Sequence, residues 1–216
     1  MEKFVFIIAC SGFVFNQRVL VFLKKRNIKV VLCPVNSQGV VEPETLKDLV
    51  NENTSLVSIM HVNNEIGAIN DIYALVKAVK EKNPSVLFHS DGVQAFMHVC
   101  TDMKALGVDM YSVSAHKVHG PKGIGALYVK KGVPLVPFIY GGGQQDNLRS
   151  GTVNVPSVIG FGQAVEALGF DFKDKLCEIK NEYIKHLTAI PDTKLICSSS
   201  APNILSIAFM GIKASS

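Results

Sequence analysis

The sequence predicts an α/β fold, in which a mostly parallel sheet is flanked by helices and is followed by the start of a small α+β C-terminal domain. From residue 28 onward, short apolar and β-branched runs alternate with segments of helical periodicity. Hydrophobic residues make up 48% of the 216 positions and charged residues 19%, a composition that excludes an intrinsically disordered chain. Buried strands that alternate with amphipathic helices are typical of a parallel sheet.

Between residues 28 and 129 we expect five strands and two helices. Pro43 opens the first helix, over 44–51, because proline favours the first turn of a helix. Asp71 caps the second helix, whose apolar residues recur every three or four positions until Asn83 and the following proline end it. The expected strands cover residues 28–33, 56–60, 86–88, 110–113 and 124–129.

The last part of the chain changes this rhythm. A glycine-rich loop over 141–151 precedes two helical stretches, at about 155–168 and 173–189. Two strand-like runs follow, at 194–197 and 204–209. This order of helices and strands indicates the opening of a second, smaller domain.

Composition and charge argue against several classes of protein. The net charge of +4 is spread along the chain, and its densest basic cluster, at 24–26, fits a solvated helix end, so no nucleic-acid partner is expected. The longest apolar run, at 4–15, is shorter than the roughly 20 residues of a membrane crossing, so no membrane partner is expected. The start of the chain resembles a signal peptide only weakly, because its apolar stretch is short and its flank is barely basic.

The cysteines favour a reducing cytoplasm. Their number is odd and none of them forms a CxxC pair, which indicates neither a disulfide framework nor a zinc ribbon. We expect each of them to be a small core residue. The five are Cys10, Cys33, Cys100, Cys177 and Cys197.

Polar and titratable residues follow three neighbouring strands at the point where each strand ends. Because ligands sit outside the carboxyl ends of parallel strands, these clusters together predict a site, although each alone also fits a turn or a helix cap. The clusters are His61, Asn63, Asn64 and Glu65; His89, Asp91 and Gln94; and Ser114, His116, Lys117 and His119.

This set of side chains suits pyridoxal phosphate. Lys117, partly desolvated at the mouth of the sheet, is a candidate to form a Schiff base. Asp91 is the candidate carboxylate that keeps the ring nitrogen protonated. Donors for the phosphate are offered by Ser114, His116 and the loop from Arg149 to Thr152. Asn64 and Gln94 are neutral donors that suit the phenolate oxygen of the ring.

Two other kinds of site are disfavoured. The glycine-rich segment 120–125 precedes a strand and lacks the strand-to-helix context of a dinucleotide fingerprint, so it predicts a tight turn and argues against a nicotinamide enzyme. His116 and His119 have a spacing that suits a metal, but no cysteine or carboxylate completes the ligand set. We therefore expect no metal site.

Four motifs resemble, in this order, those of cysteine desulfurases, which are fold-type I pyridoxal phosphate enzymes of the class V aminotransferase family. The first motif, Asn-Asn-Glu-Ile-Gly after His61, is similar to the branch that serves iron–sulfur cluster and nitrogenase maturation. The resemblance covers roughly residues 28–211. The motifs span residues 61–67, 89–94, 114–128 and 149–152.

The resemblance implies a role for each candidate residue. Lys117 would be the Schiff-base lysine and the proton shuttle, and Asp91 would pair with the pyridine nitrogen. Asn64 and Gln94 would contact the O3′ side of the ring, and the phosphate would be bound by Ser114 and His116. Thr152 would reach the phosphate of a neighbouring subunit, which implies a homodimer with shared sites.

The implied reaction converts L-cysteine to L-alanine and passes the sulfur to an enzyme cysteine as a persulfide. The sulfur would serve iron–sulfur cluster assembly, and a sulfur-acceptor scaffold protein would be a partner. Relative to the family pattern, the chain is expected to be incomplete at both ends, and Phe13 stands where the family has a histidine that stacks on the ring. None of the five cysteines matches the family's nucleophile by motif.

The resemblance also divides the chain into three parts. We expect a poorly matching N-terminal segment over 1–27, the large pyridoxal phosphate-binding domain over 28–168, and a linking helix with the start of a small domain over 169–216. Two interpretations remain open: the cofactor-binding core of a cysteine desulfurase, or a truncated and inactive member that only binds pyridoxal phosphate or dimerises.

Overall fold

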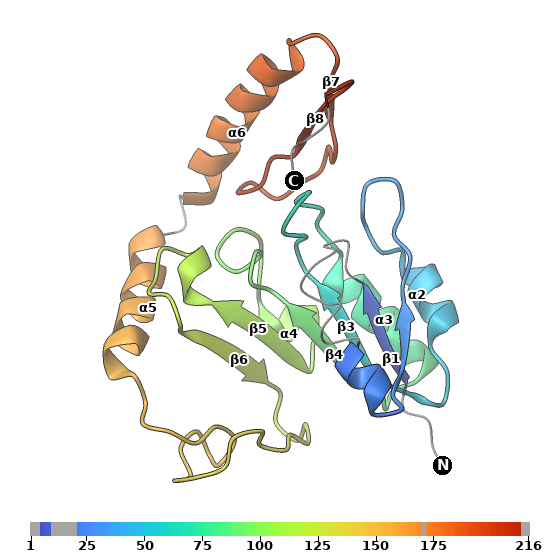
Figure 1. The fold of residues 1–216 in the computed structure, drawn as a ribbon, viewed down its shortest axis with the longest axis vertical. Coiled ribbons are helices and arrows are strands. Elements are labelled where there is room, and N and C mark those ends of the chain that lie inside the picture. Colours follow the sequence, from blue (N-terminus) through green and yellow to red (C-terminus); the bar gives the residue numbers. More distant parts are fainter. Residues whose placement is uncertain (1–4, 10–20, 170–171, 213–216) are drawn as a thin grey trace.

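A six-stranded sheet with the strand order β2-β1-β3-β4-β5-β6 dominates the computed structural model, which describes residues 5–9, 21–169 and 172–212 (Figure 1). Strands β1 to β5 run parallel, and β6 is antiparallel to β5. The strands are β1 Val5–Ala9, β2 Lys29–Leu32, β3 Thr54–Met60, β4 Leu87–Asp91, β5 Met110–Ser114 and β6 Gly125–Val129. The predicted mostly parallel sheet is therefore confirmed.

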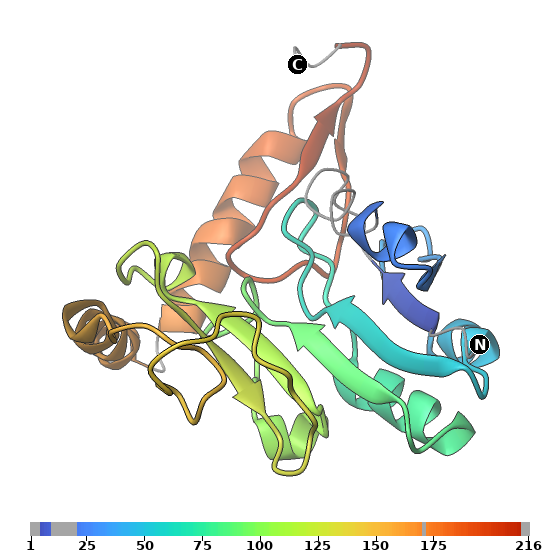
Figure 2. The same cartoon turned by 60° about the horizontal axis from the view of Figure 1, so that its bottom comes forward.

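Three helices cover one face of this sheet: α2 Pro43–Leu49, α3 Ile72–Lys82 and α4 Met103–Leu106. Figure 2 shows α3 and α4, in green, below the strands. Side chains alternate between the two faces of a strand, so Ile59 and Phe88 are buried under these helices while His89 faces the other side and is half-buried. The predicted cap of α3 is confirmed, because the Asp71 carboxylate accepts a hydrogen bond from the backbone N–H of Ala74 at 3.0 Å.

The sequence analysis did not predict β1. This strand pairs with both β2 and β3, and its residues Val5 and Ile7 are buried in the core beneath α2 and α3. A short apolar run without alternation does not distinguish a fully buried strand from other apolar segments. Residues 10–20, which include Phe13, lie outside the described part of the chain.

The elements from Phe172 onward form a smaller unit beside the ends of β3 to β5, at the top of Figure 1, whereas the helix before them lies at the left of the sheet in that view. Helix α5 Val155–Leu168 has the predicted bounds, and α6 Phe172–Thr188 is close to them. The two strand-like runs form a short antiparallel sheet of β7 Thr193–Leu195 and β8 Ile207–Phe209. No helix among the described residues combines the length and the apolar character that a membrane crossing requires.

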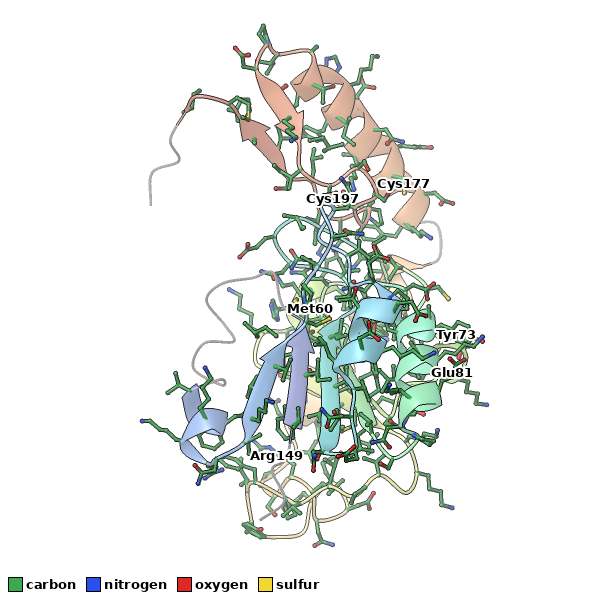
Figure 3. All side chains as sticks on the ribbon, turned by 90° about the vertical axis from the view of Figure 1, so that its right-hand side faces the viewer. Met60, Tyr73, Glu81, Arg149, Cys177 and Cys197 are labelled. Atoms are coloured by element: carbon green, nitrogen blue, oxygen red, sulfur yellow. The ribbon has the colours of Figure 1, made fainter. Side chains whose placement is uncertain are left out.

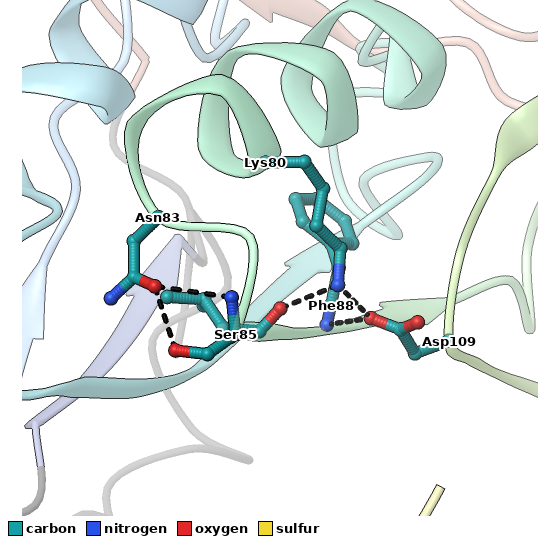
Figure 4. Close-up of polar contacts among 6 residues, drawn as sticks. Lys80, Asn83, Ser85, Phe88 and Asp109 are labelled. Atoms are coloured by element: carbon teal, nitrogen blue, oxygen red, sulfur yellow. Dashed lines mark hydrogen bonds and ion pairs between the residues drawn. The ribbon is translucent and has the colours of Figure 1, made fainter. Parts of the chain in front are cut away.

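An ion pair at the opposite end of the sheet ties α3 to the core. Lys80 Nζ lies 2.7 Å from Asp109 Oδ2 and donates a second hydrogen bond to the Val86 carbonyl at 2.6 Å (Figure 4). The same Asp109 oxygen accepts the backbone N–H of Phe88 at 2.8 Å, which anchors the first part of β4. The Asp109 side chain is only 6% exposed, so the charge depends on these partners.

We expect Asp109→Ala to lower the free energy of unfolding by about 3 kcal/mol, because it leaves the Lys80 ammonium and a buried N–H without their partner. Urea unfolding followed by circular dichroism measures this loss. Glu81→Ala, which removes the exposed ion pair of Glu81 with Lys47 at 3.0 Å, is the control and should leave the unfolding midpoint almost unchanged. Equal losses in the two variants would contradict a special role for Asp109.

Candidate active site

The carboxyl ends of β3, β4 and β5 lie side by side because their register is continuous. Met60 pairs with Asp91 across β3 and β4, and Asp91 pairs with Ser112 across β4 and β5. Lys117 ends a single 3-10 turn, η1 Ala115–Lys117, that follows β5 directly. The three polar clusters of the sequence therefore meet at one edge of the sheet, as predicted from the parallel strand order.

Asp91 is held at this edge by backbone hydrogen bonds on both sides. Its carbonyl accepts the N–H of His61 at 2.8 Å, and the N–H of Gly92 donates to the Ser112 carbonyl at 2.9 Å. Its carboxylate accepts the N–H of Val93 at 3.0 Å. Asp91 is half-buried, and among the described residues no cation lies within ion-pair distance of it.

Gly92 leaves room for an aromatic ring directly below Asp91. A Cβ atom added at Gly92 would overlap the ring and the hydroxyl of Tyr111, which is 1% exposed. The Tyr111 hydroxyl lies 2.8 Å from His61 Nδ1, and the two rings meet edge to face with centroids 6.0 Å apart. Sequence reasoning missed Tyr111, since nothing in the local pattern of β5 indicates that its ring reaches under the neighbouring strand.

Two histidines near Asp91, the buried His61 and the half-buried His89, are kept neutral by their surroundings. Burial lowers the pKa of His61 to about 4, against the small opposing effect of the Asp71 charge. Burial also lowers the pKa of His89, although the charge of Asp91 opposes it. His89 lies between two serine hydroxyls of the adjacent strands, with Ser58 Oγ at 2.8 Å from Nδ1 and Ser112 Oγ at 2.8 Å from Nε2.

Lys117 and His116 are exposed, so the described residues do not supply the desolvation expected at Lys117. Among them, no hydrogen-bond or ion-pair partner of the Lys117 amine is found, and this leaves it available to a ligand. The hydroxyl of Ser114, at the end of β5, lies 2.8 Å from Nδ1 of His116. These two predicted phosphate ligands are therefore adjacent to each other and to Lys117.

The loop after β3 is built around Asn63 and presents Asn64. The buried Asn63 side chain accepts the backbone N–H groups of Glu65 and Ile66, each at 2.9 Å, so its role is to form the turn. Asn64 is exposed at the tip of this turn, where a ligand could reach it. Gln94 is buried, and its backbone carbonyl accepts a hydrogen bond from Asn203 Nδ2 at 3.2 Å.

The C-terminal unit packs onto this same loop, a contact that sequence reasoning did not predict. Ser200 forms a bridge with Ala68, and the N–H of Ala201 donates to the Gly67 carbonyl at 2.8 Å. Lys180 of α6 fixes the segment from the other side: its amine donates to Ser200 O at 2.7 Å, Ser200 Oγ at 2.5 Å and Ala201 O at 2.7 Å. Three oxygen acceptors satisfy all three donors of this ammonium group, whose pKa is lowered by burial.

Thr152 lies apart from the other predicted residues within one chain. Because β6 is antiparallel to β5, its last residue, Val129, pairs with Met110 at the start of β5, and the chain leaves the sheet at the opposite end from Lys117. The loop that carries Arg149 and Thr152 occupies the bottom of Figure 1, and Figure 3 shows Arg149 far from Met60 at the end of β3.

The cysteines depart in part from the expectation that each is a core residue. Cys33 and Cys197 are buried, whereas Cys177 is half-buried and Cys100 is exposed, so the prediction is wrong for Cys100. Cys100 follows the turn that holds His98 and lies outside any helix or strand. Cys10 lies outside the described residues. The part of the chain that the structure describes holds no group of three or more metal-binding side chains.

The chain belongs to the class V aminotransferase family, since the sequence profile described as "Aminotransferase class-V" matches residues 7–216. Members of this family that are cysteine desulfurases use pyridoxal 5′-phosphate. Cysteine desulfurase IscS of Dictyoglomus turgidum is 42% identical over 169 residues, which are 77% of this chain and 42% of the relative. The enzyme of the same name from Clostridium botulinum is 40% identical over 200 residues, which are 89% of this chain and 50% of the relative. The chain thus spans about half the length of these curated relatives.

Solved structures confirm the fold class. A NifS-like protein superposes with a TM-score of 0.90 at 38% sequence identity, covering 96% of this chain and 58% of that protein. A protein named SspA, solved in complex with cysteine, superposes with a TM-score of 0.72 at 36% identity, and the match covers 77% of this chain and 48% of the SspA chain. The resemblance to cysteine desulfurases inferred from the four motifs is therefore confirmed.

We expect Gly92→Ala to lower the free energy of unfolding by about 3 kcal/mol, because the added methyl group forces the Tyr111 ring out of its site. Chemical denaturation measures the loss, which Tyr111→Leu in the same chain should partly relieve. Gly162→Ala in α5 is the control: nothing lies within 4 Å of its added Cβ, and alanine favours a helix, so stability should rise slightly. A loss that Tyr111→Leu leaves unchanged would contradict this packing.

Stability should also fall as the pH is lowered from about 6.5 to about 4. In this window the unfolded chain protonates His61 and the native chain does not, so the unfolded state binds more protons and gains stability. His61 alone contributes a slope of up to about 1.4 kcal/mol per pH unit. Urea unfolding at several pH values should show a shallower slope for His61→Gln and an unchanged slope for His186→Gln, since His186 is exposed on α6. Identical slopes for all three chains would contradict a neutral His61.

Proposed function

We propose that this chain is the cofactor-binding core of a pyridoxal phosphate-dependent cysteine desulfurase, which removes sulfur from L-cysteine and leaves L-alanine. The observation that carries the proposal is the placement of two groups at adjacent strand ends: the half-buried Asp91 carboxylate, which has no ion-pair partner among the described residues, and the exposed Lys117 amine, which also has none. A carboxylate and an amine in this arrangement fit a coenzyme that carries an aldehyde and a basic ring nitrogen.

Each residue would contribute a defined interaction to the bound coenzyme. Pyridoxal phosphate, when bound, supplies an electron sink for carbanion chemistry at the substrate. Asp91 would hold the proton on the ring nitrogen through its charge, and the phosphate would be bound by Ser114 and His116. Asn64 and Gln94 would bind on the O3′ side of the ring.

Lys117 would carry out the proton transfers. Its Nζ would hold the coenzyme through its aldehyde and, with substrate bound, would move a proton between substrate atoms as a general base and acid. Its position on a single turn directly after β5 supports this role, because the side chain is exposed and reaches out from a backbone fixed by the sheet.

We also propose a homodimer in which Thr152 binds the phosphate of the partner's site. Two observations support it: the Thr152 loop lies at the far end of the sheet from Lys117, and large apolar side chains near that loop are exposed in the single chain. They include Val136, Phe138 and Tyr140. A surface of this kind is typical of a protein interface.

The substrate, partner and compartment follow from the same assignment. L-cysteine would be the substrate, and the released sulfur would pass through an enzyme persulfide to a sulfur-acceptor scaffold protein in iron–sulfur cluster assembly. The four described cysteines are all free, which supports a reducing cytoplasm.

We expect purified chain mixed with pyridoxal phosphate to give a Schiff-base absorbance band, shifted from that of the free coenzyme, that is absent in Lys117→Ala, because the shift requires an amine bonded to the aldehyde. Lys122→Ala, which removes an exposed lysine five residues away, is the matched control and should keep the band. Added L-cysteine and a reductant then separate the two interpretations, because only a competent enzyme yields alanine and sulfide. A band without these products would support the inactive family member instead, and a band that persists in Lys117→Ala would contradict the assignment of the lysine.

A further inference from the structure

We infer that Tyr111, acting with His61, is the positioning residue that fixes Asp91 toward the coenzyme. The inference rests on the proposed function and adds two residues to that site. Neither residue is placed to touch the coenzyme itself, because both side chains are buried, with Tyr111 1% and His61 5% exposed. Their effect would pass through the peptide group between Asp91 and Gly92.

Four contacts form a closed ring around this peptide group. The Asp91 carbonyl accepts the N–H of His61 at 2.8 Å, and the His61 ring meets the Tyr111 hydroxyl at 2.8 Å. The Tyr111 ring in turn lies against the Cα of Gly92, whose N–H donates to the next residue of β5, Ser112, at 2.9 Å. Asp91 therefore cannot tilt without breaking a hydrogen bond or displacing a buried ring.

The direction of the side-chain hydrogen bond follows from the chemistry of the two groups. Burial raises the pKa of the Tyr111 hydroxyl, with a further contribution from the charge of Asp91, so the phenol keeps its proton. The phenol therefore donates its proton to Nδ1 of His61. The imidazole is neutral, so its own proton is on Nε2. No second positive charge arises here to compete with the coenzyme for the Asp91 carboxylate.

This arrangement also explains why the site combines Gly92 with Tyr111. Gly92 has no positive φ that would require glycine, so the requirement is the space occupied by the ring. A phenylalanine at position 111 would fill the same space in the core but would leave His61 without a partner. Core packing therefore explains the ring of Tyr111, and the hydrogen bond to His61 explains its hydroxyl group.

Tyr111→Phe tests the inference, because it keeps the ring under Gly92 and removes only the hydroxyl. We expect the dissociation constant for added pyridoxal phosphate, measured by absorbance titration, to rise about tenfold. In the chain without coenzyme, the amide protons of His61 and Gly92 should exchange with solvent about tenfold faster, as measured by NMR. Val50→Ala, at the end of α2 and 2% exposed, is the control for a general loss of stability. It should leave the dissociation constant unchanged and should not speed the exchange of the His61 and Gly92 amides more than that of other amides.

A double variant separates positioning from simple stabilisation. Tyr111→Phe alone leaves the buried His61 Nδ1 without a partner and so lowers the free energy of unfolding. His61→Phe combined with Tyr111→Phe removes both polar partners, so the free energy of unfolding should return toward that of the original chain while coenzyme affinity stays low. Recovery of both together would overturn the inference, as would unchanged exchange of the two amides in Tyr111→Phe. Failure of the original chain to bind pyridoxal phosphate would instead refute the proposed function, and the exchange measurement would still decide whether Tyr111 fixes Asp91.

Discussion

The continuous parallel register of β3, β4 and β5 is the constraint on which the candidate site depends. It places Met60, Asp91 and Ser112 in one row across three strands. The segments that follow these residues then leave the sheet next to one another, and they carry Asn64, Gln94 and Lys117. Since a shift of one residue in any strand would turn its side chains to the other face, the register fixes both the face and the height at which Asp91 is presented.

Several polar side chains at this edge pair with one another, and the Asp91 carboxylate and the Lys117 amine take no part in these pairs. His89 lies between two serine hydroxyls, His61 pairs with Tyr111, and Asn63 closes its own turn. Leaving a buried polar group without a partner is costly, so these pairings hold the strand ends rigid. Neither Asp91 nor Lys117 has an ion-pair partner among the described residues.

The sequence allowed the local parts of this account to be predicted. Helix α5 and the Asp71 cap depend on neighbours three or four residues apart, and β3 to β6 are bounded by turn residues, so each has a local signal. The meeting of three polar clusters followed from the rule for parallel strands. Strand β1 lacked such a signal, because its apolar residues, among them the buried Val5, Ile7 and Ile8, do not alternate with polar ones.

Long-range contacts could not be predicted in the same way. Tyr111 and Gly92 lie on different strands, and only their contact shows that one requires the other. The three hydrogen bonds of Lys180 join α6 to a segment that rests on the Gly67 loop, a pairing that depends on how the two units pack. The exposure of Cys100 is likewise decided by what surrounds it in space.

Chemical trapping of the coenzyme tests the central claim most directly. The chain is mixed with pyridoxal phosphate, reduced with borohydride, digested and analysed by mass spectrometry to find the modified lysine. The arrangement of strand ends predicts a pyridoxyl group on Lys117. A pyridoxyl group on a different lysine, such as Lys122 in the next turn, or on none, would contradict it.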